Sequence, residues 1–460
     1  MLDRPYLTGE AAFSESTLER LAFRPTPLWL LLTVMLVGAA LAIGFGAIVK
    51  RPSSAGRLGA IAVSIADIPH TLRRAIGEGA FRPYSKEAYL PQPGGFRRNA
   101  AQPFADPGYV LLTAYDERRA RPIVRLMRLR DGAVVHDYAP DVDAINARST
   151  FASPLINLKR DRNARDNLMM HPLLMPDGGL IIHDTSPLAR VDACGRVLWM
   201  IDGIFHHAVE RGPDGSIWAA YRYPHSPDAE VSPTFNDEAI MNVSPGGRIL
   251  SHERVADILD RNGLGETWRS RPYNDDPFHL NDVQPVFADG PYWRRGDLFL
   301  SLRNMSTILL YRPSTGRVLW SRTGPWSFQH DVTVLDDHRV IVFDNNWRFA
   351  FREGQVDGLN RVALYDFASG AVTFPNAAGM RRNAIRTRAQ GRATPMPNGD
   401  MMIEETDRGR LMRMAPDGTL RWRYIAADSA MRRYELRWSR YLDMVTDGGA
   451  IRAAANMRCT

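Results

Sequence analysis

From residue 109 onward the chain repeats one pattern at intervals of about 40–50 residues, the spacing of repeat architectures. Each copy holds an apolar strand, a turn built on Asp-Gly or Asn-Gly, a second apolar strand, a third strand ending in D/P-x-x-G, and a fourth with an aromatic or apolar pair. The copies begin at Tyr109 (the weakest), His171, His206, His279, Gln329 and near Arg392.

Residues alternate in polarity with a period of two inside the copies, and hairpin turns recur every ~8–12 residues, as in antiparallel sheet. Four strands per copy are typical of β-propeller blades. A TIM barrel or a doubly wound fold requires long amphipathic helices between strands, and the sequence offers none here. We therefore predict an all-β, six-bladed β-propeller, with "RYLDMVTDGGAI" near the C-terminus closing the ring.

One segment is not globular. Leu28–Val49, "LWLLLTVMLVGAALAIGFGAIV", carries no charge and is long enough to cross a bilayer, which takes about 20 helical residues. Basic residues flank both ends, so the positive-inside rule gives no orientation. The preceding 27 residues contain acids, unlike a cleaved signal peptide. We predict a single uncleaved transmembrane helix.

This helix divides the chain into four parts. We predict a cytoplasmic tail (1–27), a transmembrane anchor (28–49), a juxtamembrane connector (50–101) and a catalytic propeller (102–460). In the connector, "LGAIAVSIADIPHTLRRAI" has apolar helical spacing that fits either a helix on the membrane surface or a plain linker helix. The prolines and glycines of "YLPQPGGF" mark the connector's end.

The charge and the cysteine content limit the classes of partner and ligand that we expect. The formal charge is +7 and the pI about 9.5, but the arginines are scattered and no nucleic-acid-binding motif is found, so we expect no nucleic-acid partner. Cys194 and Cys459 show neither CxxC nor metal-ligand spacing. A disulfide between them is compatible with the sequence, which does not by itself establish one.

Several histidines open blades. Because the first strand of each propeller blade lines the central channel, residues at these openings can converge. His207 and His330 each stand seven residues before a turn aspartate, with His206 an alternative to His207. His279 precedes the first strand of its blade, and Arg303 closes the second strand of that blade in "LFLSLRN". We expect these side chains to face one channel mouth.

The stretches "DPFHLNDV", "SLRN" and "FQHDVTVLDDHRVIVFDNN" together resemble the bacterial arylsulfate sulfotransferases that do not use PAPS. That family is a six-bladed propeller, and the resemblance covers roughly His171 to Ile425. It implies that His330 is the nucleophile and carries a transient sulfuryl group, that His279 and Arg303 bind sulfate, and that His207 is the other channel histidine.

The resemblance also implies an aryl sulfate donor, a phenolic or glycan acceptor, a sulfohistidine intermediate, and neither a cofactor nor a metal. Family members act outside the cytoplasm, which implies a single-pass protein of the bacterial inner membrane with its propeller in the periplasm. Three features depart from the family: the anchor, the cysteines, which lie 265 positions apart where the family has a close-spaced disulfide, and the insertion "GPYWRRG" between His279 and Arg303.

The chemistry supports the same residues. Sulfuryl transfer resembles phosphoryl transfer, in which positioning and electrostatics dominate. Arg303 can hold two oxygens in its planar fork, a neutral His330 can attack sulfur, and His207 or His279 can protonate the leaving phenol. We expect Arg303 to lower the pKa of His330. Asp331 follows His330 in the strand and is not expected to orient it.

Two other functions fit the sequence. One is a non-catalytic propeller that acts as scaffold of a cell-envelope complex, and the other is a metal-dependent enzyme that uses the channel histidines as ligands. His171 opens a blade but has no counterpart in the family, so we expect a structural role. Glu404 and Glu405 are predicted to lie at a solvated strand edge.

Overall fold

A computed structural model describes residues 27–50, 55–66, 68–69, 84–85, 87, 89–101, 103–151, 157–224, 226–228, 231–232, 234–350 and 353–459. The chain divides into two compact units, residues 1–76 and 77–460. The first unit contains α2 (Leu28–Lys50) and α3 (Gly56–Ala66), and the second contains the sheets.

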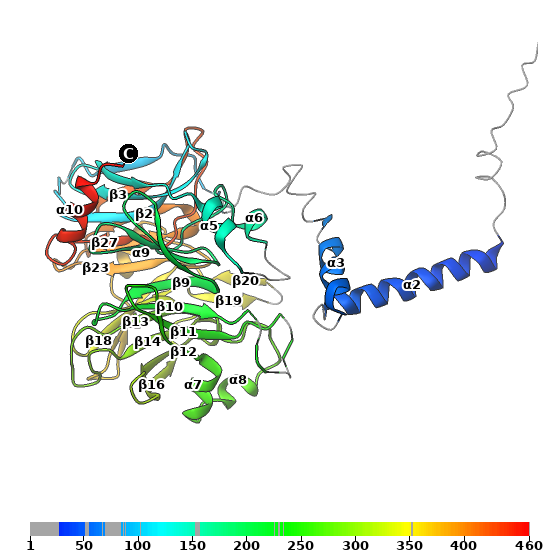
Figure 1. The fold of residues 1–460 in the computed structure, drawn as a ribbon. Coiled ribbons are helices and arrows are strands. Elements are labelled where there is room, and N and C mark those ends of the chain that lie inside the picture. Colours follow the sequence, from blue (N-terminus) through cyan, green and yellow to red (C-terminus); the bar gives the residue numbers. More distant parts are fainter. Residues whose placement is uncertain are drawn as a thin grey trace, which may run out of the picture. The chain divides into compact units, whose positions relative to one another are not determined.

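Six antiparallel sheets form the blades of a propeller, which confirms the predicted fold (Figure 1). Numbered in chain order and written from the inner strand outward, their strands are as follows. Blade 1 is β27 (Arg440–Leu442), β2 (Tyr109–Asp116), β3 (Arg121–Arg128), β4 (Val134–Tyr138); blade 2 is β5 (Leu173–Leu174), β6 (Leu180–Ile182), β7 (Leu188–Val191), β8 (Val197–Ile201); blade 3 is β9 (Ile204–Arg211), β10 (Ile217–Arg222), β11 (Glu238–Val243), β12 (Ile249–Arg254).

The second half of the ring repeats the arrangement. Blade 4 is β13 (Leu280–Pro285), β14 (Leu298–Leu302), β15 (Thr307–Arg312), β16 (Arg317–Thr323); blade 5 is β17 (His330–Val334), β18 (Arg339–Asp344), β21 (Arg361–Asp366), β22 (Val372–Thr373); blade 6 is β23 (Arg392–Pro395), β24 (Met401–Glu405), β25 (Arg410–Met414), β26 (Leu420–Ile425). A separate hairpin, β19 (Trp347–Ala350) and β20 (Glu353–Val356), is inserted in blade 5.

The ring closes as predicted, because β27 near the C-terminus pairs with β2 and supplies the inner strand of blade 1. The predicted boundary at residue 102 is wrong: β1 (Gly95–Arg98) pairs with β26 as a fifth strand of blade 6. The "PGG" preceding it is therefore the entry to a strand. A Cβ on Gly94 would lie 2.4 Å from the carbonyl oxygen of Ala427, so a side chain there is excluded by this close approach.

Six hydrophobic clusters lie between successive blades, one in each interface of the ring. A strand that packs against a neighbour on both faces is apolar on both, as β14 (buried throughout) shows. The outer strands are exposed on alternate residues instead, as in β16. Burial of both faces between blades is what holds the ring together.

Short helices occupy the connections. They are α5 (Val142–Arg148), α6 (Leu158–Asp161), α7 (Val255–Arg261), α8 (Glu266–Arg269), α9 (Ala377–Arg382), α10 (Gly448–Asn456) and the 3-10 turns η2 (Arg303–Met305) and η3 (Thr406–Arg408). α7 packs against blades 3 and 4. α10 packs beside blades 1 and 2, where a Cβ on Gly178 would lie 2.5 Å from the backbone of Ala454.

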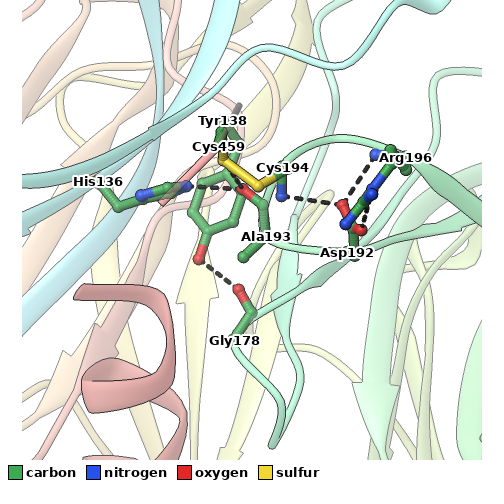
Figure 2. The surroundings of a disulfide bond; sticks show 8 residues. All are labelled: His136, Tyr138, Gly178, Asp192, Ala193, Cys194, Arg196 and Cys459. Carbon is green, nitrogen blue, oxygen red and sulfur yellow. Dashed lines mark hydrogen bonds and ion pairs between the residues drawn. A yellow bond between two sulfur atoms is a disulfide. The ribbon is translucent and has the colours of Figure 1, made fainter. Parts of the chain in front are cut away.

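The two cysteines are joined, which settles the pairing that the sequence left open. Figure 2 shows the Cys194–Cys459 disulfide, which ties the chain after α10 to the turn between β7 and β8. The same turn is held by His136, whose Nε2 lies 2.7 Å from the carbonyl oxygen of Ala193. The C-terminal segment is thus fixed both by strand pairing in blade 1 and by a covalent bond to blade 2.

α2 is apolar around its circumference, and none of the span Leu28–Val49 is buried in the protein. A helix of this composition suits a bilayer or a buried core, and its exposure excludes the core. It is the single helix in the described part of the chain that is long and apolar enough to cross a membrane. By length and composition it is either a membrane anchor or a signal sequence.

Candidate active site

The predicted site residues gather on one face of the propeller. We call this the loop face; it carries the connections between blades and those between the second and third strands of a blade. His207 lies in β9, His279 immediately before β13, and His330 is the first residue of β17. Arg303 follows β14, and its N–H donates to the carbonyl oxygen of His279 (3.1 Å). The start of β13 and the end of β14 meet at the same edge because the strands are antiparallel.

The insertion "GPYWRRG" lies at the other end of these strands. It spans residues 290–296, between the end of β13 at Pro285 and the start of β14 at Leu298. The length of both strands therefore separates it from His279 and Arg303. The departure from the family's sequence does not alter the loop face at this blade.

Bulges in the inner strands aim the side chains. In β9 the pairing with β10 shifts between Val209 and Phe205, and His207 between them has a left-handed φ of 55°. Strand alternation would send His206 and His207 to opposite faces, whereas a bulge re-aims side chains. His279 has a φ of 52° immediately before β13. Both histidines at the start of blade 3 thus reach the channel.

The four imidazole rings form a cluster. The ring centroid of His207 lies 5.0 Å from that of His279, 5.8 Å from that of His330 and 5.3 Å from that of His206. The centroids of His206 and His279 are 6.5 Å apart. Of the two adjacent candidates, His207 is therefore the one beside His330, and His206 lies behind it.

His330 is completely buried and held at both ring nitrogens. Its Nδ1 lies 2.6 Å from Oδ1 of Asn345, and the backbone N–H of Gln390 donates to its Nε2 (3.2 Å). The amide nitrogen of Asn345 donates to the carbonyl oxygens of Thr387 and Gln390, so its oxygen faces His330 as an acceptor. His330 therefore carries its proton on Nδ1, and the lone pair lies on Nε2.

The pKa of His330 is lowered well below its usual value, first by burial and then by the positive charge of Arg303. The predicted direction is confirmed, and burial is the larger cause. Asp331 does not orient His330, as expected: its carboxylate accepts from the backbone N–H of Ala393 (2.8 Å) and pairs with Arg392 (3.0 Å).

Arg303 presents a partly unsatisfied guanidinium. Its Nη1 donates to Oδ1 of Asn304 (2.8 Å), and its central carbon lies 4.6 Å from the ring centroid of Phe328. Nε is buried and has no hydrogen-bond partner among the described residues. Burial lowers the pKa of Arg303 to about 10, so the group remains a cation at neutral pH and has donors to spare for an anionic ligand.

Two of the histidines are paired with carboxylates that sequence analysis missed. Nδ1 of His279 lies 2.6 Å from Oδ2 of Asp276. Burial alone would raise the pKa of Asp276, but the hydrogen bond and charge of His279 hold it well below its usual value. Nε2 of His206 lies 2.8 Å from Oε2 of Glu238, which is completely buried. Each imidazole thus has an anionic neighbour.

The site residues that the sequence analysis missed differ in whether a nearby motif pointed to them. Asp276 stands three residues before His279, and Asn345 is the first of the two asparagines in "VIVFDNN", so both lie beside or inside the motifs. Glu238 had no such signal. Trp438 also went unnoticed; its ring centroid lies 6.0 Å from His207 and 6.1 Å from His330, so it walls the cluster.

Charged side chains fill the channel next to the histidines. Each of the six blades contributes an ionisable residue from its inner strand or just before it. Five of these residues are buried and Arg392 is partly buried: Arg440, His171, Glu210, Asp282, Asp331 and Arg392. Arg440 pairs with Glu210 (2.7 Å), and Nη1 of Arg392 lies 2.5 Å from Nε2 of His171. His171 thus belongs to this ion-pair layer, where its contacts are structural.

The prediction for the two glutamates is wrong, because Glu404 and Glu405 are completely buried. Glu404 accepts from the backbone N–H groups of Trp438 (2.8 Å) and Ser439 (2.6 Å). Glu405 accepts from the N–H of Arg386 (2.6 Å) and pairs with Arg410. Backbone N–H groups of other segments thus satisfy both carboxylates in place of solvent. Strand alternation cannot reveal such contacts.

The channel histidines do not assemble as a metal site. In the described ranges, the one group of three potential ligands within 4.8 Å of one another is Asp336, Asp337 and His338. These residues lie in the turn after β17, at the opposite end of that strand from His330. The channel imidazoles pair instead with carboxylates, with an amide and with one another.

Residues 171–427, more than half of the chain, match the sequence profile of the family described as Arylsulfotransferase (ASST). No curated protein matches the chain. Among solved structures, a protein of unknown function from Bacteroides caccae is 12% identical over 73% of this chain and 99% of its own, with a TM-score of 0.47. TolB from Acinetobacter baumannii is 14% identical over 75% and 69% (TM-score 0.41). A virginiamycin B lyase from Staphylococcus aureus is 13% identical over 73% and 89% (TM-score 0.37). Such TM-scores support no inference about this chain.

Proposed function

The chain belongs to the arylsulfotransferase family, and from that premise we propose that it moves a sulfuryl group from an aryl sulfate to a phenolic or glycan hydroxyl. The transfer is independent of PAPS and passes through a sulfohistidine at His330. The observation that carries the proposal is the state of His330: Nδ1 donates to Asn345, so the lone pair of a neutral ring lies on Nε2, where it accepts from the N–H of Gln390 (3.2 Å), and the ring lies beside that of His207. A neutral imidazole is a competent nucleophile for a covalent intermediate.

In the first half-reaction the Nε2 lone pair forms the N–S bond and the S–O bond to the aryl ring breaks. The aryl oxygen leaves with the electron pair and takes a proton from an acid in the site. The sulfurylated ring keeps the hydrogen on Nδ1 and is stabilised by Asn345. The N–H of Gln390, now 3.2 Å from Nε2, releases that nitrogen as sulfur approaches and is then free for a sulfuryl oxygen.

In the second half-reaction the acceptor oxygen attacks sulfur, the N–S bond breaks and its electron pair returns to Nε2. The hydroxyl proton of the acceptor passes to a base. In such a loose transition state the charge is spread over the equatorial oxygens, so donors aimed at them carry much of the catalysis. We assign this role to Arg303, which has an unsatisfied Nε, and to His279, with His207 beside them.

The competing functions have less support. A scaffold has no need of a buried imidazole cluster with a depressed pKa at His330, since such groups cost stability and concentrate at functional sites. A metal enzyme would need three ligand atoms close together, and in the described residues the histidines do not provide them.

For location, we propose that residues 28–49 anchor the chain in the bacterial inner membrane as a single pass, with 1–27 in the cytoplasm and the propeller in the periplasm. The Cys194–Cys459 disulfide supports this, because disulfides persist in oxidising compartments. Alkaline phosphatase fused to the C-terminus is expected to be active. An inactive phosphatase together with a fluorescent cytoplasmic reporter at the same position would refute the orientation.

The activity is tested by supplying 4-nitrophenyl sulfate to the full-length protein without acceptor and quenching rapidly. We expect one sulfuryl group per chain on the peptide that contains "FQHDVTVL", labile to acid, and its release when phenol is added. His330→Asn is expected to form no adduct; asparagine is preferred to alanine because the site is completely buried and alanine would leave a cavity.

Circular dichroism and the unfolding midpoint show whether the variant is folded. Donor turnover by a folded His330→Asn protein at the wild-type rate would remove His330 as the nucleophile. Wild-type protein that releases no nitrophenol and carries no adduct would refute the sulfotransferase proposal itself.

A further inference from the structure

Three adjacent strands of blade 3 bring together a chain of polar groups behind His207. Arg222 at the end of β10 pairs across the sheet with Glu238 at the start of β11, and its Nη2 lies 2.8 Å from Oε1. The other oxygen of Glu238 lies 2.8 Å from Nε2 of His206. Nδ1 of His206 in turn lies 3.0 Å from Nδ1 of His207. The groups form a line from a buried carboxylate to the histidine beside the nucleophile.

These contacts determine where the protons lie. Glu238 is ionised: burial raises its pKa, but His206 and Arg222 together hold it below the usual value. A carboxylate oxygen 2.8 Å from an imidazole nitrogen requires a proton on that nitrogen, because two lone pairs at this distance repel. Nε2 of His206 therefore carries a proton. The two atoms are close but are not aligned as a hydrogen bond, as is common for catalytic contacts before substrate binds.

The tautomer of His207 follows. With Nε2 protonated, neutral His206 has its lone pair on Nδ1, so the 3.0 Å contact requires a proton on Nδ1 of His207. His207 then has its lone pair on Nε2. If the pair gains one proton, the shared proton moves to Nδ1 of His206, where the charge faces Glu238, and Nε2 of His207 becomes a donor.

We propose that Glu238 and His206 are positioning residues of a proton relay through which Nε2 of His207 takes the acceptor's hydroxyl proton and gives a proton to the leaving aryl oxygen. The inference rests on the proposed function and deepens it, because it assigns the acid and base of the two half-reactions to His207. The ring centroids of His207 and His330 lie 5.8 Å apart, so His207 stands beside the proposed nucleophile.

The protons balance over one turnover. In the second half-reaction the acceptor O–H bond breaks, its proton binds Nε2 of His207, and the Nδ1 proton shifts to His206, which becomes an imidazolium beside Glu238. In the next first half-reaction the shifts reverse, and the aryl oxygen leaves as a phenol. The donor brings a negative charge into the site, and an opposite charge nearby favours the protonated pair.

His279 and Asp276 are the rival acid and base, since they form a second histidine–carboxylate pair (2.6 Å). His279 lies on the side of Arg303, whose backbone it contacts, and we assign that pair to binding of sulfuryl oxygens. The two assignments make opposite predictions for donors whose leaving groups differ in acidity. A weakly acidic leaving phenol needs a proton in the transition state, whereas 4-nitrophenol leaves readily as an anion.

The test compares single-turnover release of phenol and of 4-nitrophenol from the two aryl sulfates by the full chain. We expect Glu238→Gln and His206→Gln to lose ~10²-fold or more with phenyl sulfate and less than tenfold with 4-nitrophenyl sulfate, since general acid catalysis contributes about 10²–10⁴-fold. Asp276→Asn is expected to slow both donors alike. Asp297→Asn is the matched control; it removes another buried carboxylate paired with an arginine (Arg312, 2.7 Å) in the neighbouring blade.

Equal losses for the two donors in Glu238→Gln would make the role structural and overturn the relay, as would a selective loss in Asp276→Asn. Nitrogen-15 spectra of histidine-labelled protein give a readout without turnover: Nε2–H is expected on His206 and Nδ1–H on His207, and the reverse tautomers would also overturn it. Absence of any His330 adduct in wild type would instead overturn the proposed function, so the two failures are distinguishable.

Discussion

Asn345 offers the sharpest test of how the site is built, because it fixes the tautomer of His330, the proposed nucleophile. Its side chain makes three hydrogen bonds: it accepts from His330 Nδ1 (2.6 Å) and donates to the carbonyl oxygens of Gln390 (2.9 Å) and Thr387 (3.3 Å). In Asn345→Ala each is lost at about 1 kcal/mol, so we expect the free energy of unfolding to fall by about 2–4 kcal/mol.

The effect on rate is expected to be larger than the effect on stability suggests. Without Asn345 the proton of His330 is free to sit on Nε2, which blocks attack on sulfur. Loss of the aspartate that fixes a catalytic histidine's tautomer costs ~10⁴-fold. Asn345 is neutral and stabilises the charged ring less, so we expect a loss of about 10²-fold or more in the rate of His330 sulfurylation.

The assay is single-turnover adduct formation, with unfolding by urea measured in parallel. Asn360→Ala is the matched control: that side chain also makes three buried hydrogen bonds, to Asn345 and Thr387 backbone atoms, and none to His330. We expect it to lose similar stability and less than tenfold in rate. The hydrogen bond from Asn345 raises the pKa of His330, so its loss lowers that pKa further. A rate defect that vanishes at high pH, or no defect in a folded variant, would refute the reasoning.

Four further predictions concern Arg303, the buried histidines and the disulfide. Arg303→Lys keeps the charge but not the fork, so we expect ~10²-fold slower sulfurylation with a small change in unfolding midpoint; unchanged turnover would remove Arg303 from the site. The depressed pKa of His330 predicts that sulfurylation by 4-nitrophenyl sulfate, whose leaving group needs no proton, is independent of pH from 8 down to 6.5; a steady fall over that range would contradict it. A buried histidine with a lowered pKa binds fewer protons in the folded than in the unfolded protein below about pH 6.5. Each such histidine is therefore expected to lower the free energy of unfolding by up to ~1.4 kcal/mol per pH unit as pH falls. The five are His171, His183, His206, His207 and His330. Cys459→Ser is expected to cost at most about 2–3 kcal/mol, at the low end for a long loop, because β27 already holds that end of the chain; the wild-type midpoint in dithiothreitol is expected to match the variant's.

Most of the correct predictions came from short-range sequence patterns. Strand alternation follows from the extended backbone, and turns depend on a few adjacent residues, so the blades, their order and the blade-opening histidines were readable directly. His330, His279 and Arg303 were identified as candidate site residues from short sequence motifs. Asn345 and Asp276 were inside or beside those motifs, but only the fold shows that they contact imidazoles.

Contacts between distant segments were not readable. Burial of Glu404 depends on backbone N–H groups from residues 438 and 439, and β1 joined the propeller because the edge of β26 was open to a further strand. Neither leaves a periodic signal, since the partner residues lie in a distant segment of the chain. The same holds for the Cys194–Cys459 bond.

By itself the sequence determined a six-bladed ring, one apolar helix before it, a set of histidines at the blade openings, and an arginine after the second strand of one blade. Only the tertiary structure decided that His207 stands beside His330 with His206 behind it, because a bulge in β9 suspends the alternation that would have separated them. It also decided which carboxylate faces which imidazole. Alternation is a local property of an extended backbone, whereas bulges and cross-strand pairs such as Arg222 and Glu238 are settled by the register of strands that meet only when the blades fold.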